Sequence, residues 1–111
     1  MTAPDTAAPD TAASPALPTV YVSIGNSDDR LTQAQWSRYA EQFVQTVRRH
    51  AVRVHGEWFS APTAPWQNAC VAFEIDLDGQ AALRRTLTAL RAEFHQDSIA
   101  WAVVRDQVEF V

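Results

Sequence analysis

The sequence predicts a two-layer α+β sandwich whose elements follow the order β-α-β-β-α-β. Four short segments alternate apolar and polar residues, as half-buried strands do. Two longer segments carry apolar residues at helical spacing, one after the first strand and one after the third. With 111 residues, of which 47% are hydrophobic, the chain has the size and composition of one small domain.

The charge balance is acidic, with 13 Asp and Glu residues against 9 basic residues, all of them arginine. Abundant alanine without lysine is typical of a GC-rich bacterial coding sequence. Nucleic-acid binding usually requires clustered positive charge, so the net charge of −4 disfavours a nucleic-acid partner. No segment approaches the roughly 20 apolar residues of a membrane helix, and the amino terminus has no secretory-signal pattern. Because Cys70 is the only cysteine, no internal disulfide can form, and we expect a cytoplasmic protein.

Residues 1–18 are predicted to form a flexible tail, and residues 19–111 a single α+β domain. The tail is rich in Ala, Pro, Thr and Asp, and Leu17 is its only large apolar residue after Met1. Such a segment buries too little apolar surface to offset the entropy lost on ordering.

The first half of the domain is predicted to contain a strand and a well-signalled helix. The strand spans residues 19–24, and residues 25–29 form a polar turn. Thr32 stands three residues before Gln35, the spacing of a capping box, so the helix is expected to begin there. Its buried stripe is predicted to comprise Trp36, Ala40, Phe43, Val44 and Val47.

The second half is predicted to contain strands at 51–59, 70–75 and 98–104, with an optional fifth strand at 108–111. In the strand 51–59 we expect Val52, Val54 and Trp58 on the buried face, with Arg53, His55 and Glu57 on the other. Asp78 is predicted to cap the second helix. The buried residues of that helix are expected to be Leu83, Leu87, Leu90 and Phe94, and those of the last strand Ile99, Trp101 and Val103.

This element order resembles the ferredoxin-like fold, in which both helices cover one face of an antiparallel sheet. The resemblance concerns the fold alone, because that fold carries many unrelated functions. Placing the apolar residues of the two middle strands on one face predicts a register for their pairing. In that register Trp58 lies opposite Val71, Gly56 opposite Phe73, Val54 opposite Ile75, Arg53 opposite Asp76 and His55 opposite Glu74.

The predicted topology brings three loops together at one end of the sheet. Polar side chains beside aromatic ones, held on loops by a rigid sheet, are typical of a binding surface. The residues predicted to form this binding rim are Asn26, Asp28, Asp29, Arg30, Trp66, Gln67 and Asn68. The same residue types are also common in turns for purely structural reasons.

Evidence for catalysis is weak. His55 beside Glu74 is a candidate acid–base pair, but a charge ladder on a polar sheet face explains both residues equally well. No spacing of His and Cys residues is typical of a metal site, and three glycines are too few for a phosphate-binding loop. We therefore expect no metal and no cofactor.

The uncovered sheet face is predicted to show mainly small residues, together with Tyr21. One stacking aromatic is too few for the usual mode of RNA binding, whereas small residues allow close approach by another protein. We therefore expect a small non-enzymatic protein-interaction or regulatory module, acting as a homodimer and with an adjacent protein partner. The alternative is a small-molecule-binding domain or minor enzyme that uses the loop rim. A third class, a protein that blocks a toxin or nuclease, fits the acidic surface as well.

Overall fold

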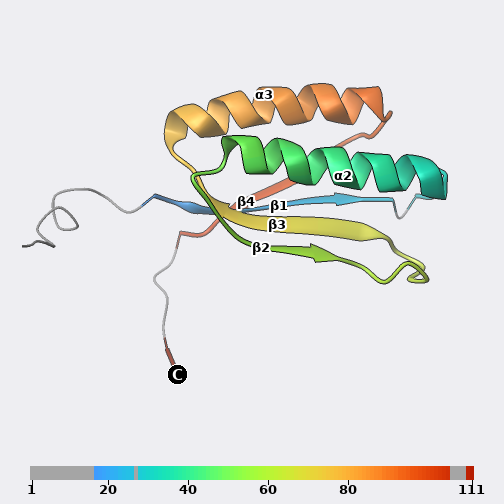
Figure 1. Cartoon of the computed structure of the whole chain (residues 1–111), viewed down its shortest axis with the longest axis horizontal. Coiled ribbons are helices and arrows are strands. Elements are labelled where there is room, and N and C mark those ends of the chain that lie inside the picture. Colours follow the sequence, from blue (N-terminus) through green and yellow to red (C-terminus); the bar gives the residue numbers. More distant parts are fainter. Residues whose placement is uncertain (1–16, 27, 106–109) are drawn as a thin grey trace, which may run out of the picture.

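The computed structural model describes residues 17–26, 28–105 and 110–111. The chain forms β1 (Thr19–Gly25), α2 (Gln33–His50), β2 (Arg53–Phe59), β3 (Asn68–Glu74), α3 (Leu77–Glu93) and β4 (Ala100–Val103) (Figure 1). The β-α-β-β-α-β order is the one that the sequence predicts. Most of the predicted tail, and most of the optional fifth strand at 108–111, lie outside the described residues.

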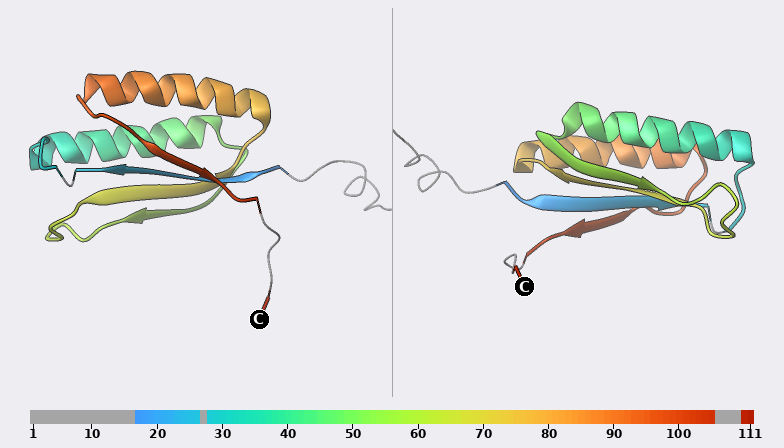
Figure 2. Two further views of the ribbon diagram at one scale, coloured as in Figure 1. Left: turned by 180° about the vertical axis from the view of Figure 1, so that it is seen from behind. Right: turned by 60° about the horizontal axis from the view of Figure 1, so that its bottom comes forward.

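The four strands form one antiparallel sheet with the order β2-β3-β1-β4. Both helices lie on the same face of this sheet (Figure 1), and the views in Figure 2 agree. The predicted two-layer α+β sandwich is therefore confirmed, and its topology is that of a ferredoxin-like fold. In the described part of the chain, no helix or strand covers the other face of the sheet; this uncovered side is called the open face below.

The core lies between the helices and the sheet, and the predicted helical stripes form most of it. Every residue predicted for the two stripes is buried, and Tyr39 joins them with no exposed surface. Its ring stacks on Phe94 at a centroid distance of 4.8 Å and meets Trp36 edge-on. From the sheet, the inward residues of β1 and β3 complete the core: Val20, Val22, Ile24, Ala69, Val71 and Phe73.

Helix α2 begins as its sequence predicts. The Thr32 hydroxyl accepts the Gln35 N–H at 3.2 Å, and the Gln35 side chain accepts the Thr32 N–H at 2.8 Å. The capping box therefore satisfies two backbone donors that a helix start leaves unpaired.

Helix α3 begins two residues earlier than the sequence predicts. Asp76, and not Asp78, is the N-cap, and its Oδ1 accepts the Gly79 N–H at 2.6 Å. Both aspartates favour a helix start, but only Asp76 has the extended backbone that an N-cap requires. Asp78 lies in the first turn, where its negative charge still favours the helix dipole.

The predicted register between β2 and β3 is wrong. Val54 lies opposite Phe73 and Gly56 opposite Ala72, so two steps along β2 match one step along β3. His55 is the extra residue of a β-bulge. Strand β2 is at the edge of the sheet and pairs on one side only, which makes such an irregularity easy to accommodate.

The bulge reverses which face each following residue of β2 occupies. Trp58 lies opposite Cys70 on the open face and is 55% exposed, which corrects the prediction that it belongs to the core. Glu57 lies opposite Val71 and turns to the helix side, which corrects its predicted place beside Arg53 and His55. A one-residue insertion changes sides in this way because strand side chains alternate with a period of two.

Strand ends differ from the predicted ones by one or two residues at most positions. Strand β2 starts at Arg53, and Val52 before it is 61% exposed instead of buried. Strand β4 covers only residues 100–103, and Ile99, Trp101 and Val103 are partly buried because the strand forms the other sheet edge.

Candidate functional site

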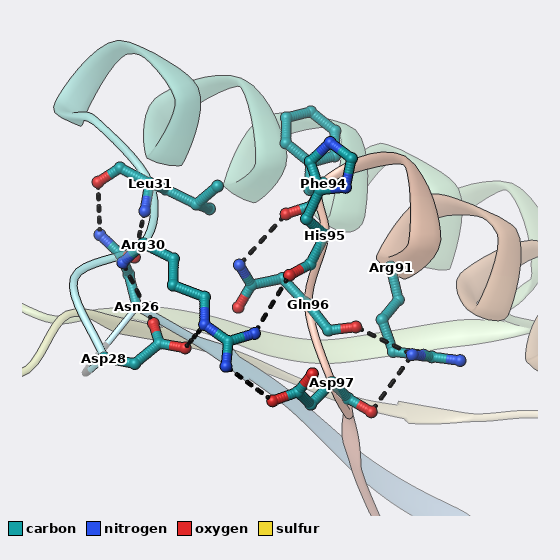
Figure 3. A network of polar contacts seen from close by, with 9 residues as sticks. All are labelled: Asn26, Asp28, Arg30, Leu31, Arg91, Phe94, His95, Gln96 and Asp97. Atoms are coloured by element: carbon teal, nitrogen blue, oxygen red, sulfur yellow. Dashed lines mark hydrogen bonds and ion pairs between the residues drawn. The ribbon is translucent and has the colours of Figure 1, made fainter.

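Three loops meet at one end of the molecule, as the sequence predicts for the binding rim. Asn26, after β1, is joined to the loop between β2 and β3, because its backbone N–H donates a hydrogen bond to Gln67 O at 2.9 Å. Arg30 reaches the loop after α3, where its Nη2 lies 3.1 Å from Asp97 Oδ2 (Figure 3). The rim therefore joins segments that are far apart in the sequence.

Asn26 holds the loop between β1 and α2 in place. Its side chain is buried, with Nδ2 donating to Leu31 O at 3.1 Å and Oδ1 accepting the Leu31 N–H at 3.0 Å (Figure 3). The same Nδ2 donates to Gln67 Oε1 at 3.2 Å. Both polar ends of this amide are thus used within the protein.

Gln67 connects that loop to helix α2. Its Nε2 donates to Gln33 Oε1 at 2.6 Å, and its Oε1 accepts from Gln33 Nε2 at 3.0 Å. Gln33 is not among the residues that the sequence predicts for the rim, because a glutamine in the first turn of a helix carries no local signal of such a partner. These paired amides satisfy polar groups that the loops bury.

Arg30 is the charged centre of the rim. Its Nε lies 3.0 Å from Asp28 Oδ2, and its Nη2 pairs with Asp97 (Figure 3). The hydrogen bond to Asp97, followed by the charges of Asp97 and Asp28, raises the pKa of Arg30. Asp29 adopts a positive φ of 59° at the turn, a conformation that aspartate tolerates better than most residues.

The remaining rim residues lie apart from this polar network. Trp66, in the loop between β2 and β3, is 69% exposed. Asn68 begins β3, where its Nδ2 donates to Trp66 O at 3.4 Å and its backbone N–H donates to Ser60 Oγ. The structure therefore places all seven predicted residues at one end. Asn26, Gln67 and Arg30 bond to other segments of the chain, whereas Asp28 pairs with Arg30 of its own loop.

A groove of about 650 Å³ runs from the rim along the gap between α2 and the edge strand β2. Trp36, Ala40 and Val44 of the helix and Phe59 of the strand give it apolar walls. Arg48 and Glu57 line its far part with a two-pronged ion pair at 2.5 and 2.6 Å. The hydrogen bonds that Arg48 donates to Glu57, and the negative charge of Glu57, raise the pKa of Arg48. The bulge in β2 makes this pair possible, because it turns Glu57 toward the helix.

The weak acid–base candidates do lie in contact. His55 Nε2 is 2.8 Å from Glu74 Oε2 on the open face, and the His55 side chain is 42% exposed. In the ladder, however, Arg53 is the residue opposite Glu74. A histidine placed between a carboxylate and solvent on a sheet surface also fits the charge-ladder interpretation.

Within residues 17–26, 28–105 and 110–111, no three His, Cys, Asp or Glu side chains gather as metal ligands would. Over the same residues, no helix has the length and apolar character needed to cross a bilayer. Cys70 is a free, partly buried cysteine in β3.

The open face carries two exposed aromatic residues among small ones. One row across the sheet consists of Trp58, Cys70, Ser23 and Ala100, and the next of Gly56, Ala72, Tyr21 and Ala102. Trp58 and Tyr21 are 55% and 46% exposed. Neither row contains a charged side chain. The charged residues Arg53, His55 and Glu74 lie toward one end of the face.

The chain matches no protein-family model, no curated protein and no solved structure.

Proposed function

We propose that this protein is a non-enzymatic protein-interaction module whose contact surface is the open face of the sheet. The main support for this proposal is the exposure of Trp58 and Tyr21 on two adjoining rows that contain no charged residue. Tryptophan and tyrosine are enriched at the energetic centres of protein interfaces. An uncharged surface around them loses little solvation energy when another protein covers it.

The state of the loop rim also supports this proposal. Binding sites for small molecules usually present a few polar groups to the ligand. In the rim, the amides of Asn26, Gln67 and Gln33 bond to one another or to backbone, and Arg30 is shared between two aspartates. A structural role accounts for these groups, whereas no comparable internal contact accounts for the exposed aromatic residues of the open face.

Self-association is the form of binding that can be tested without a second protein. Sedimentation velocity of the full chain, over concentrations up to about 200 µM, is expected to show a sedimentation coefficient that rises with concentration. Trp58→Arg introduces a charge within the proposed contact and is expected to abolish the rise. Trp66→Arg is the matched control, because it places the same charge on an exposed tryptophan in the loop.

Two results would contradict the proposal. One is a wild-type chain that sediments as a monomer throughout that range. The other is a loss of association in Trp66→Arg together with normal association in Trp58→Arg, which would move the contact from the sheet to the loop rim.

A further inference from the structure

We infer that the pocket between α3 and the edge strand β4 binds a small organic anion, whose carboxylate or phosphate group is held by Arg84 and Arg91. The pocket lies on the helix side of the sheet, so it is separate from the open face, and the inference does not depend on the proposed function. It rests on the volume of the pocket, its apolar lining and the way in which its two arginines are held.

The pocket has the size and the apolar surface of a small-molecule site. Its volume is about 420 Å³, within the range of roughly 300–1,000 Å³ that such sites usually have. Leu87 of α3, together with Ile99 and Trp101 at the β4 edge, provides the apolar lining. Leu87 is buried and the other two are partly buried. The carbon skeleton of a ligand can therefore pack against these side chains.

Arg84 and Arg91 add positive charge to the same pocket. They are two helical turns apart, so they lie on one side of α3 at levels about 10 Å apart along its axis. Within residues 17–26, 28–105 and 110–111, neither forms an ion pair with a carboxylate. Guanidinium groups bind carboxylates and phosphates through paired hydrogen bonds, so these two arginines favour an anionic ligand.

Both guanidinium groups are held by other parts of the protein. The Arg84 guanidinium carbon lies 4.7 Å from the centre of the Trp101 ring, a cation–π contact that requires no hydrogen-bond acceptor. Arg91 donates through Nη1 to Gln96 O at 2.8 Å and to Asp97 O at 3.2 Å (Figure 3), which leaves its Nε and Nη2 for a ligand. Because these contacts already order two long side chains, binding costs less conformational entropy than at unsupported arginines.

Asp97 also lines the pocket and brings a negative charge close to it. Its carboxylate pairs at 3.1 Å with Arg30, which does not line the pocket, so that charge is compensated from outside (Figure 3). Charges farther away than about 8 Å are largely screened at physiological ionic strength. The two arginines can therefore attract an anion although the whole chain has a net charge of −4.

The larger groove between α2 and β2 does not favour an anion in this way. Its arginine, Arg48, already forms a two-pronged ion pair with Glu57, and Glu41 adds a second carboxylate to the lining. An anionic ligand is therefore expected in the α3–β4 pocket and not in the groove.

NMR chemical-shift mapping of the isotopically labelled full chain tests the site. Naphthoate and naphthyl phosphate are the probes, because they join one aromatic body to a carboxylate or to a phosphate. At least one of them is expected to shift the amide signals of Thr88 and Ser98 and the indole signal of Trp101 in a saturable way, with a Kd of about 1 mM or below. Naphthalenemethanol has the same body without a charge and is expected to bind about tenfold more weakly or less.

Arg84→Gln separates the charge of the pocket from the charge of the whole protein. It removes one of the two cations and is expected to weaken binding of the anionic probes by about fivefold or more. Arg85→Gln is the matched control, because it makes the same change of charge at the next residue, which is exposed and does not line the pocket. Its Kd is expected to stay within about twofold of the wild-type value. Circular dichroism melting checks that both variants fold.

Three results would overturn the inference. One is that neither anionic probe, at concentrations up to about 10 mM, shifts the three signals in a saturable way. Another is that the neutral alcohol binds as tightly as the anions, which would make the pocket an apolar site only. The third is an equal loss of affinity in Arg84→Gln and Arg85→Gln, which would mean that overall charge attracts the probes. Preference for one of the two anions supports the inference and identifies the head group.

Discussion

His55 contacts Glu74 through a distance of 2.8 Å, although Arg53 is the residue that lies opposite Glu74 in the β2–β3 ladder. The bulge explains this difference. His55 is the extra residue of β2, and its side chain reaches the carboxylate of Glu74. In a regular ladder only Arg53 would lie opposite that carboxylate. The same bulge places Trp58 on the open face and Glu57 beside Arg48, so one irregular residue decides the character of two surfaces.

Tyr39 is expected to contribute its ring, and not its hydroxyl, to stability. It is fully buried, and its hydroxyl is the only buried side-chain polar atom of the described residues without a hydrogen-bond partner. Tyr39→Phe removes an unpaired polar atom and is expected to leave the free energy of unfolding unchanged or to raise it by about 1 kcal/mol. Urea denaturation measures this, with Tyr21→Phe as the exposed control. A loss above about 1 kcal/mol would reveal a partner for the hydroxyl.

The burial of the Tyr39 phenol leads us to expect a loss of stability in alkaline solution. Burial raises the pKa of its phenol to about 12, against a weaker opposing effect of Arg91. Above the unfolded pKa of about 10, the unfolded state releases this proton while the folded state still holds it. Stability is therefore expected to fall as the pH rises from about 10 to 12, and to fall less in Tyr39→Phe. Equal slopes in the two proteins would contradict the prediction.

Asn26→Ala is expected to destabilise the fold strongly. It removes three hydrogen bonds and leaves the backbone N–H and carbonyl of Leu31 without this partner. We expect a loss of about 2–4 kcal/mol in the free energy of unfolding. The control is Asn68→Ala, which removes one long and exposed side-chain contact and is expected to cost less than about 1 kcal/mol. Similar losses in the two variants would show that Asn26 does not anchor the loop.

The start of α3 gives a matched pair of aspartates. Asp76→Ala removes the N-cap acceptor of the Gly79 N–H and is expected to cost about 1 kcal/mol. Asp78→Ala removes only a favourable charge in the first turn, so we expect a loss of about 0.3–0.5 kcal/mol that declines at high salt. Thermal denaturation of both variants measures the difference. A larger loss of stability in Asp78→Ala than in Asp76→Ala would indicate that Asp78 is the N-cap, as the sequence predicts.

Gly79→Ala is expected to destabilise the protein although alanine favours helices. A Cβ at this position would lie 2.7 Å from Ile75 Cγ1 and 2.9 Å from Asp76 Oδ1. Ile75 is fully buried and has little room to move. We expect a loss of about 1–3 kcal/mol in urea denaturation. Gly56→Ala, whose Cβ would meet nothing within 4 Å, is the control. If Gly79→Ala stabilised the protein, the Ile75 side chain would have to move aside at little energetic cost.

Helix signals in the sequence are the most dependable part of the prediction, and their physical origin explains why. The capping box at Thr32 and Gln35 and the apolar stripe from Trp36 to Val47 involve residues within a few turns of one another. Such interactions depend on local geometry that every α-helix shares. They fix α2 and its buried face, and the similar stripe of α3 does the same. Alternation in β1 likewise identifies its inward residues.

The predicted rim shows the limit of this reasoning. Chain order alone implies that three loops gather at one end, and the structure shows Asn26, Gln67, Arg30 and Asp97 together there. Residue types did not reveal that Asn26 and Gln67 are buried, since a polar residue in a turn looks the same whether it bonds to water or to another loop. Gln33 was missed for the same reason.

By itself, the sequence determines the element order, the helix faces and the layered architecture, because each depends on periodicity and on capping between near neighbours. Only the tertiary structure decides on which side of the sheet Trp58 lies. An inserted residue on an edge strand costs little locally and leaves no mark in composition, yet it turns every later side chain of β2 to the opposite face. The contacts that accompany the bulge, the Arg48–Glu57 ion pair and the ladder with β3, form only when the chain has folded.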